Sequence, residues 1–159
     1  YFCCYRYLCP LYYGDYPAVM HERLGERLPK FSREEKELLR NKLDFLGLNH
    51  YTSRFIAHVP NGIDENFFYK AQEVERIVEW EGGEKIGEKA ASEWLYIVPW
   101  GLRKALNYIA QKYNNLPIYV TENGMDDEEN NSLPLHEILD DKLRISYFKG
   151  YLAAVAQAI

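Results

Sequence analysis

Glu122 stands where a reactive carboxylate would be expected in an α/β protein. The apolar run at residues 116–121 (LPIYVT) stops at Glu122, and Asn123 and Gly124 follow. In α/β barrels, reactive groups gather at the carboxyl ends of strands, because the connecting loops there form the site. The alternative is ordinary turn chemistry, since Asn-Gly is a favoured turn pair and a solvated Glu beside it needs no role. Residue types alone leave both interpretations open.

Asn49 and Tyr51 hold a similar position after an earlier apolar run at residues 43–48. Side chains alternate along a strand, so positions 49 and 51 share a face. Two consecutive strands would then deliver polar groups toward one rim. Without further information, Asn49 could equally cap the strand end, and Tyr51 could be a packing residue.

Short sequence patterns predict the elements that would position these residues. Ser32 followed by Glu35 is a capping-box pattern, which predicts a helix to about Lys42 with Leu38 and Leu39 on its inner stripe. The runs at 43–48 and 116–121 are short and nearly continuous, as expected for strands buried on both faces of a parallel sheet.

The rest of the chain alternates helices with loops. Residues 52–93 show no clear period, and a stretch that long without regular elements is usually functional. Two further helices are predicted, one from Pro99 to about Asn114 and one over 139–159. Their apolar stripes are Leu102, Leu106, Ile109 and Tyr113 in the first, and Leu143, Tyr147, Tyr151, Val155 and Ile159 in the second. Residues 125–134 are acidic and loop-like.

This order of elements predicts an α/β fold with a parallel sheet. Two strands alone leave unpaired sheet edges, and a (β/α)₈ TIM barrel takes about 250 residues. We therefore expect the 159 residues to be a portion of a larger barrel.

Composition excludes several classes of partner. The net charge is −5 without a dense Lys/Arg stripe, which argues against nucleic acid. The sequence lacks an apolar run of about 18 residues, so we expect no membrane span. The aromatic share of 15% suits carbohydrate sites but also suits buried packing. Oligomeric state is not predicted.

Residues 1–10 are an atypical stretch that we interpret as a ragged or misassigned terminus. They hold all three cysteines, Cys3, Cys4 and Cys9. No second ligand pair follows at zinc spacing, so no metal site is predicted. The stretch does not resemble a secretory signal, and the compartment stays undetermined.

Four ordered motifs resemble glycoside hydrolase family 1, specifically its plant β-glucosidases. The segment IYVTENGM at 118–125 resembles the family's nucleophile signature, and DFLGLNHYTS at 44–53 its motif at the end of barrel strand six. LYYGDYP at 11–17 and SEWLYIVP at 92–99 resemble the preceding stretch and the aglycone-cleft segment. The similarity covers residues 11–159, which implies a fragment with about strands 6 and 7 and their flanking helices.

The resemblance assigns roles within retaining hydrolysis of β-D-glucosides, a reaction of glycoside metabolism without metal or organic cofactor. Glu122 matches the nucleophile, and Tyr51 a hydroxyl donor that orients it. Asn49 matches the polar network of the sugar subsite, and Trp94 an indole facing the aglycone. His50 is expected to point away from the rim as a structural residue.

The family's acid/base residue lies in a Thr-x-Asn-Glu-Pro motif that does not occur in this sequence. Retaining hydrolysis needs two carboxyl groups about 5–5.5 Å apart. We therefore expect the chain alone to be inactive, and because its sheet edges are unpaired we expect it to be marginally folded. Alternatives are a noncatalytic sugar-binding derivative of the fold, or a thioglucosidase or transglucosidase parent.

Overall fold

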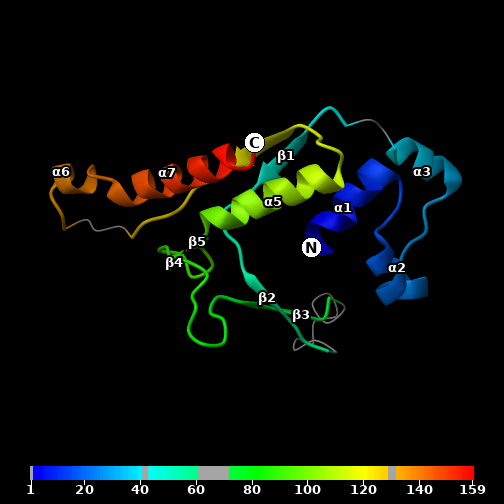
Figure 1. Cartoon of the computed structure of the whole chain (residues 1–159), viewed down its shortest axis with the longest axis horizontal. Helices are drawn as coiled ribbons and strands as arrows, with labels where there is room; N and C mark the ends of the chain where they lie inside the picture. The colour runs from blue at the N-terminus through cyan, green and yellow to red at the C-terminus, as the bar shows by residue number, and fades with distance from the viewer. Residues whose placement is uncertain (1, 41–42, 61–71, 129–131) are drawn as a thin grey trace. The chain divides into compact units, whose positions relative to one another are not determined.

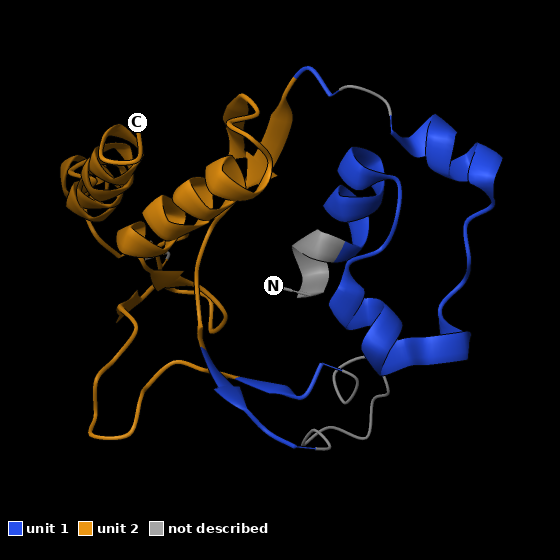
Figure 2. Ribbon diagram, turned by 45° about the vertical axis from the view of Figure 1, so that its right-hand side comes forward, with its two compact units in different colours: residues 1–44, 56–75 blue, residues 45–55, 76–159 orange. Residues whose placement is uncertain are grey.

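The computed structural model describes residues 2–40, 43–60, 72–128 and 132–159, and the side chains from residue 6 onward. The chain divides into two compact units, residues 1–44 with 56–75 and residues 45–55 with 76–159 (Figure 2). The second unit contains Asn49, Tyr51, Trp94 and Glu122.

Helices account for most of the regular structure in the described part of the first unit. They are α1 (Phe2–Tyr13), α2 (Ala18–Leu24), the 3₁₀ helix η1 (Gly25–Arg27) and α3 (Arg33–Leu39) (Figure 1). Helix α1 crosses residue 10, where the sequence predicted the end of an atypical stretch. Cys9, in this helix, is buried with 3% of its surface exposed.

The capping box at Ser32 is confirmed. Ser32 Oγ accepts from the backbone N–H of Glu35 at 3.2 Å, and Glu35 Oε2 accepts from the Ser32 N–H at 2.7 Å. The helix ends at Leu39, and Lys42 lies outside the described residues. The placement of Leu38 on the inner stripe is wrong, because Leu38 is 70% exposed. Lys36 and Leu39, three residues apart on one face, make the inward contacts instead.

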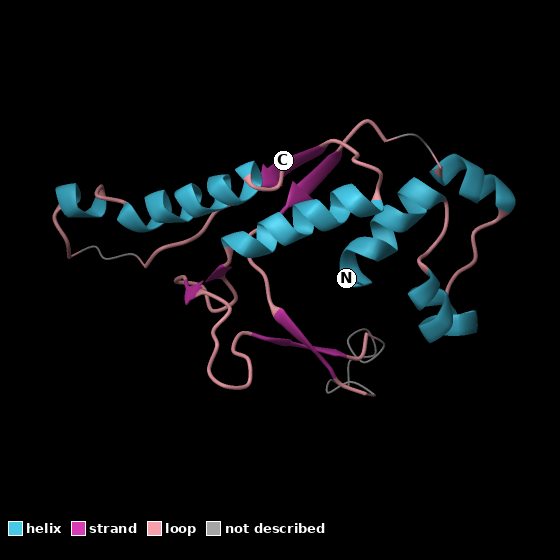
Figure 3. Cartoon of the chain, viewed as in Figure 1, coloured by secondary structure: helices cyan, strands magenta, loops and turns pink. Residues whose placement is uncertain are grey.

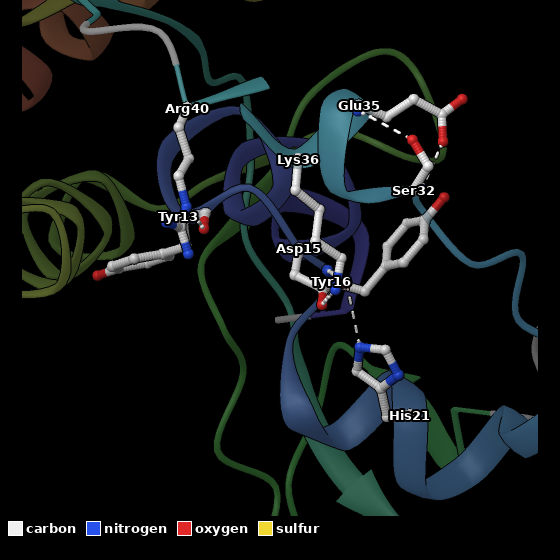
Figure 4. Close-up of polar contacts among 8 residues, drawn as sticks. All are labelled: Tyr13, Asp15, Tyr16, His21, Ser32, Glu35, Lys36 and Arg40. Carbon is white, nitrogen blue, oxygen red and sulfur yellow. Dashed lines mark hydrogen bonds and ion pairs between the residues drawn. The ribbon is translucent and has the colours of Figure 1, made fainter. Parts of the chain in front are cut away.

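Asp15 connects the loop after α1 to α2 and α3 (Figure 4). Its carboxylate pairs with Lys36 Nζ at 2.5 Å and His21 Nε2 at 3.3 Å, and accepts from the Tyr16 N–H at 2.8 Å. Burial raises the pKa of Asp15, but the hydrogen bonds from Lys36 and from the Tyr16 N–H, together with the Coulombic interactions with Lys36 and His21, outweigh it, so the pKa lies below the ordinary value. The carboxylate therefore stays charged and holds the three segments together.

The second unit is built around a parallel pair of strands, β1 (Leu46–Asn49) and β6 (Ile118–Glu122) (Figure 3). Helix α5 (Pro99–Lys112) lies between them in the chain, and α7 (Lys142–Ala156) follows β6 after the short α6 (Leu135–Ile138). The predicted parallel pairing and both long helices are confirmed. The last helix is shorter than predicted, and Ile159 is fully exposed beyond its end.

The core of this unit lies on one side of the strand pair. It joins α5, α7, β1 and β6 through Leu102, Leu106, Tyr147 and Tyr151, against which Leu48, Ile118 and Val120 pack. The other face is exposed, with Gly47 and Asn49 on β1 and Tyr119 and Thr121 on β6. The expectation that both strands are buried on both faces is wrong for this chain, because α5 and α7 cover one face only.

Residues 52–93 contain short strands that the sequence did not indicate. They are β2 (Phe55–His58), β3 (Val74–Ile77) and β4 (Glu88–Lys89). β2 pairs with β3, and β4 pairs antiparallel with β5 (Tyr96–Ile97). Strands of two to four residues show too little alternation to reveal a period. Gly82 and Gly83 form a turn with φ of 102° and 85°.

Candidate active site

Glu122 and Tyr51 are in direct contact at the carboxyl ends of the two parallel strands. Glu122 is the last residue of β6, and the Tyr51 hydroxyl donates to Glu122 Oε2 at 2.6 Å. This hydrogen bond to the carboxylate raises the pKa of Tyr51 above its ordinary value. The shift favours the protonated hydroxyl, so Tyr51 remains a donor toward Glu122.

A register shift brings the strand ends to the same level. Leu48 pairs with Val120, but the next residue of β1, Asn49, pairs with Glu122. The N–H of His50 then donates to the carbonyl oxygen of Glu122 at 2.9 Å. Irregularities of this kind re-aim side chains next to active sites. Here the irregularity lies directly beside the carboxylate.

Asn49 lies beside this pair but its side chain makes a different contact. Asn49 Oδ1 accepts from Thr121 Oγ1 at 2.6 Å, on the exposed face of the strands. Its expected part in a sugar-binding network stays a prediction.

Trp94 is close to Tyr51, and its expected place beside the aglycone stays a prediction. The indole is 55% exposed, and its ring meets that of Tyr51 edge-on at a centroid distance of 6.1 Å. Both residues line an open pocket of about 540 Å³, which is completed by Leu95, Gly124, Met125 and Asp126. The pocket offers a mostly apolar wall beside the Tyr51–Glu122 pair.

The segment carrying Trp94 is held by Arg54 and Thr52. Arg54 donates to the backbone carbonyl of Trp94, and its guanidinium lies 4.7 Å from the centre of the Tyr96 ring. Thr52 Oγ1 donates to the Tyr96 carbonyl at 2.8 Å and accepts from its N–H at 3.1 Å. Asp126, which lines the same pocket, accepts hydrogen bonds from the Ser92 N–H at 3.1 Å and from the Ser92 hydroxyl.

His50 lies toward the helices, as expected. Its Nε2 is 3.2 Å from Ser53 Oγ, and its ring is 6.0 Å from that of Tyr151. Burial lowers the pKa of His50, which favours the neutral imidazole.

Sequence reasoning missed the polar roles of three residues behind the site. Asn123 Nδ2 donates to the His50 carbonyl at 2.7 Å and to Tyr147 Oη at 2.9 Å, and Tyr151 Oη donates to the Tyr51 carbonyl at 3.1 Å. The helical stripe marked both tyrosines as packing residues. A buried Tyr hydroxyl usually has a hydrogen-bond partner, and this is the signal that could have revealed them.

The described residues contain neither a metal-binding cluster nor a membrane-spanning helix. No group of three or more His, Cys, Asp or Glu side chains in the described ranges is placed to hold a metal ion. None of the helices described is both long enough and apolar enough to cross a bilayer.

The chain belongs to glycosyl hydrolase family 1, because the model of that family matches residues 2–159. Beta-glucosidase 42 of Arabidopsis thaliana and beta-glucosidase 4 of Oryza sativa subsp. japonica are each 62% identical to it, over 154 and 153 residues. Each alignment covers 96% of this chain, but 31% and 32% of the relatives.

A crystal structure of a rice β-glucosidase has the same fold over 99% of this chain and 34% of its own length. The TM-score is 0.89 and the sequence identity is 38%. The structural neighbours are (β/α)₈ barrels of this family, so the chain corresponds to part of such a barrel. It spans about a third of the length of the relatives that it matches.

Proposed function

We propose that Glu122 is the nucleophile of a retaining β-glucosidase of which this chain forms part. The observation that carries the proposal is the 2.6 Å hydrogen bond from the Tyr51 hydroxyl to Glu122 Oε2 at the ends of β1 and β6. A nucleophilic carboxylate must be ionised and held in one orientation. A neutral hydroxyl donor that contacts one carboxylate oxygen fixes the orientation of the carboxylate and leaves the other oxygen for attack.

The reaction that fits this arrangement proceeds through a glycosyl-enzyme. Glu122 attacks C1 of the glucoside, the bond from C1 to the aglycone oxygen breaks, and an acid protonates that oxygen. The same group, now a carboxylate, then removes a proton from water, whose oxygen attacks C1, so that the bond from C1 to Glu122 breaks and glucose is released. The acid must come from residues outside this sequence. In support, a rice β-glucosidase 38% identical to this chain has been solved in a covalent complex with glucose.

Trp94 and Asn49 are proposed to bind the two parts of the substrate. The exposed indole of Trp94 supplies a flat apolar surface, which suits an aryl or otherwise hydrophobic aglycone. Asn49, which pairs with Glu122 across the strands, can present its amide to sugar hydroxyls.

A fluorinated glucoside that traps the glycosyl-enzyme tests the nucleophile. After inactivation of the complete protein, peptide mass mapping should place the adduct on Glu122, and Glu122→Gln should abolish both labelling and turnover. Glu128→Gln is the matched control, because Glu128 is an exposed carboxylate on the loop that follows β6. A label on any other residue would overturn the proposal, and sugar binding without hydrolysis would favour a noncatalytic protein.

The chain alone is proposed to lack glycosidase activity, since retaining hydrolysis needs a second carboxyl group. The purified chain incubated with an aryl β-glucoside should release no aglycone above the level of Glu122→Gln. Turnover that depends on Glu122 would show that this part of the proposal is wrong.

A further inference from the structure

Helix α7 holds two tyrosines whose hydroxyls reach the strand ends from behind the site. We propose that Tyr147 and Tyr151 are positioning residues that fix the backbone of Tyr51 and the side chain of Asn123, so that the Tyr51 hydroxyl stays aligned on Glu122. This inference rests on the proposed role of Glu122 as nucleophile.

The two rings form one buried unit. Tyr147 and Tyr151 are stacked with a centroid distance of 4.1 Å and an interplanar angle of 24°, and each is 1% exposed. Packing against Leu102 and Leu106 of α5 holds the rings in place. Their hydroxyls therefore occupy fixed positions behind the ends of β1 and β6.

Tyr151 binds the backbone of Tyr51. Its hydroxyl donates to the Tyr51 carbonyl at 3.1 Å and accepts from the N–H of Val98 at 3.0 Å. Val98 precedes α5 and is fully buried. The hydroxyl thus connects Tyr51, two residues beyond the end of β1, to the start of α5.

Tyr147 binds the residue next to Glu122. Its hydroxyl accepts from Asn123 Nδ2 at 2.9 Å and lies 3.4 Å from the Tyr51 carbonyl, to which it donates. Asn123 Nδ2 also donates to the carbonyl of His50 at 2.7 Å. These hydrogen bonds hold the Tyr51 backbone and Asn123, the residue after Glu122, to α7.

Positioning rather than proton transfer is the role that the surroundings of the hydroxyls support. Burial raises the pKa of Tyr147 and of Tyr151 above the ordinary value, so both stay protonated in neutral solution. Neither hydroxyl contacts Glu122 itself. A displacement of about 1 Å at a reacting centre can lower a rate about 100-fold. Contacts that hold the neighbours of the reacting residues can therefore control catalysis.

The test measures kcat, KM and thermal stability of the complete protein with an aryl β-glucoside. Tyr147→Phe and Tyr151→Phe keep the stacked rings and remove only the hydroxyls. We expect kcat to fall about tenfold in each, because one or two buried hydrogen bonds are lost, with KM changed less than about twofold. Tyr113→Phe is the matched control, since Tyr113 is 2% exposed at the far end of α5. It should leave kcat unchanged whatever it does to stability.

A double-mutant comparison separates positioning from general destabilisation. If Tyr151 acts through Tyr51, the effect of Tyr151→Phe on kcat should shrink to less than about twofold in a Tyr51→Phe background. An unchanged kcat in both single variants, an equal loss in Tyr113→Phe, or an undiminished loss in the Tyr51→Phe background would each overturn the inference. Failure of the proposed function is distinguishable, because the unmodified protein would then carry the fluorinated-glucoside label on a residue other than Glu122, or would not turn over the substrate at all.

Discussion

Replacing Tyr51 by Phe is the change that most directly tests the chemistry of the site. It removes the hydroxyl that donates to Glu122 Oε2 at 2.6 Å and retains the ring that meets Trp94 edge-on. The two halves of a retaining reaction should respond differently. During attack the carboxylate loses negative charge, whereas during hydrolysis of the glycosyl-enzyme it regains that charge. The Tyr51 hydroxyl stabilises the charged form, so its removal should slow the second half more than the first.

The expected magnitude follows from the geometry. Removing one donor from a developing charge in an active site lowers kcat about 100- to 1000-fold. In Tyr51→Phe, the free Glu122 carboxylate is also less stabilised before attack. This partly offsets the lost stabilisation of the transition state for attack. We therefore expect kcat to fall about 10- to 100-fold, mostly through slower hydrolysis of the glycosyl-enzyme.

Rapid-mixing measurements with a nitrophenyl β-glucoside provide the assay. The Tyr51→Phe variant of the complete protein should show a burst of nitrophenol followed by slow turnover, and a lower KM, because the glycosyl-enzyme accumulates. Tyr119→Phe is the control, since this tyrosine of β6 is 62% exposed and packs against Phe45 instead. A kcat within about threefold of the unmodified protein, or a slower reaction without burst and with unchanged KM, would refute the reasoning.

Three further predictions concern stability of the complete protein. Gly101→Ala should lower the free energy of unfolding by about 1–3 kcal/mol, because the new Cβ would lie 2.1 Å from Ser53 Oγ. Gly124→Ala is the control, since its new Cβ meets nothing within 4 Å and the change should be nearly neutral. Thermal unfolding of both variants measures the difference. Burial raises the pKa of Tyr147 in the folded chain, so above about pH 10 the unfolded chain loses this proton first. The free energy of unfolding should therefore fall as pH rises. In urea unfolding, Tyr147→Phe should make this fall less steep. The lowered pKa of Asp15 contributes stability above about pH 4 that is lost as pH falls through the folded value. Asp15→Asn should remove this acid dependence and cost about 0.5 kcal/mol near pH 7, because the paired side chains are over a third exposed.

Local chemistry made part of the fold predictable. The capping box at Ser32 and the stripe from Leu102 to Tyr113 depend on neighbours in the chain, and Asn114 and Asn115 end α5 with φ of 51° and 56°. The short strands β2 and β4 have only four and two residues, which is too few to show an alternating pattern, so no local pattern revealed them.

The site was predictable only as a set of positions. The resemblance placed Glu122, Tyr51 and Trp94 in one site, and the geometry brings Tyr51 into contact with both of the others. The support from α7 was not predicted, because helical spacing explains Tyr147 and Tyr151 fully as core residues. Which polar atoms their hydroxyls meet depends on a segment about a hundred residues away, at Tyr51.

The exposed face of β1 and β6 bears both on how a complete barrel would bury this unit and on the environment of Glu122. Phe45 and Tyr119 are 56% and 62% exposed on that side, and Glu122 is exposed as well. Strands of a parallel sheet are ordinarily covered on both faces, so further strands are needed to bury these side chains. The same strands would shield Glu122 from water, and electrostatic interactions strengthen as the local dielectric constant falls. The surface that completes the hydrophobic core is therefore also the surface that would strengthen the Tyr51–Glu122 hydrogen bond, on which the proposed chemistry depends.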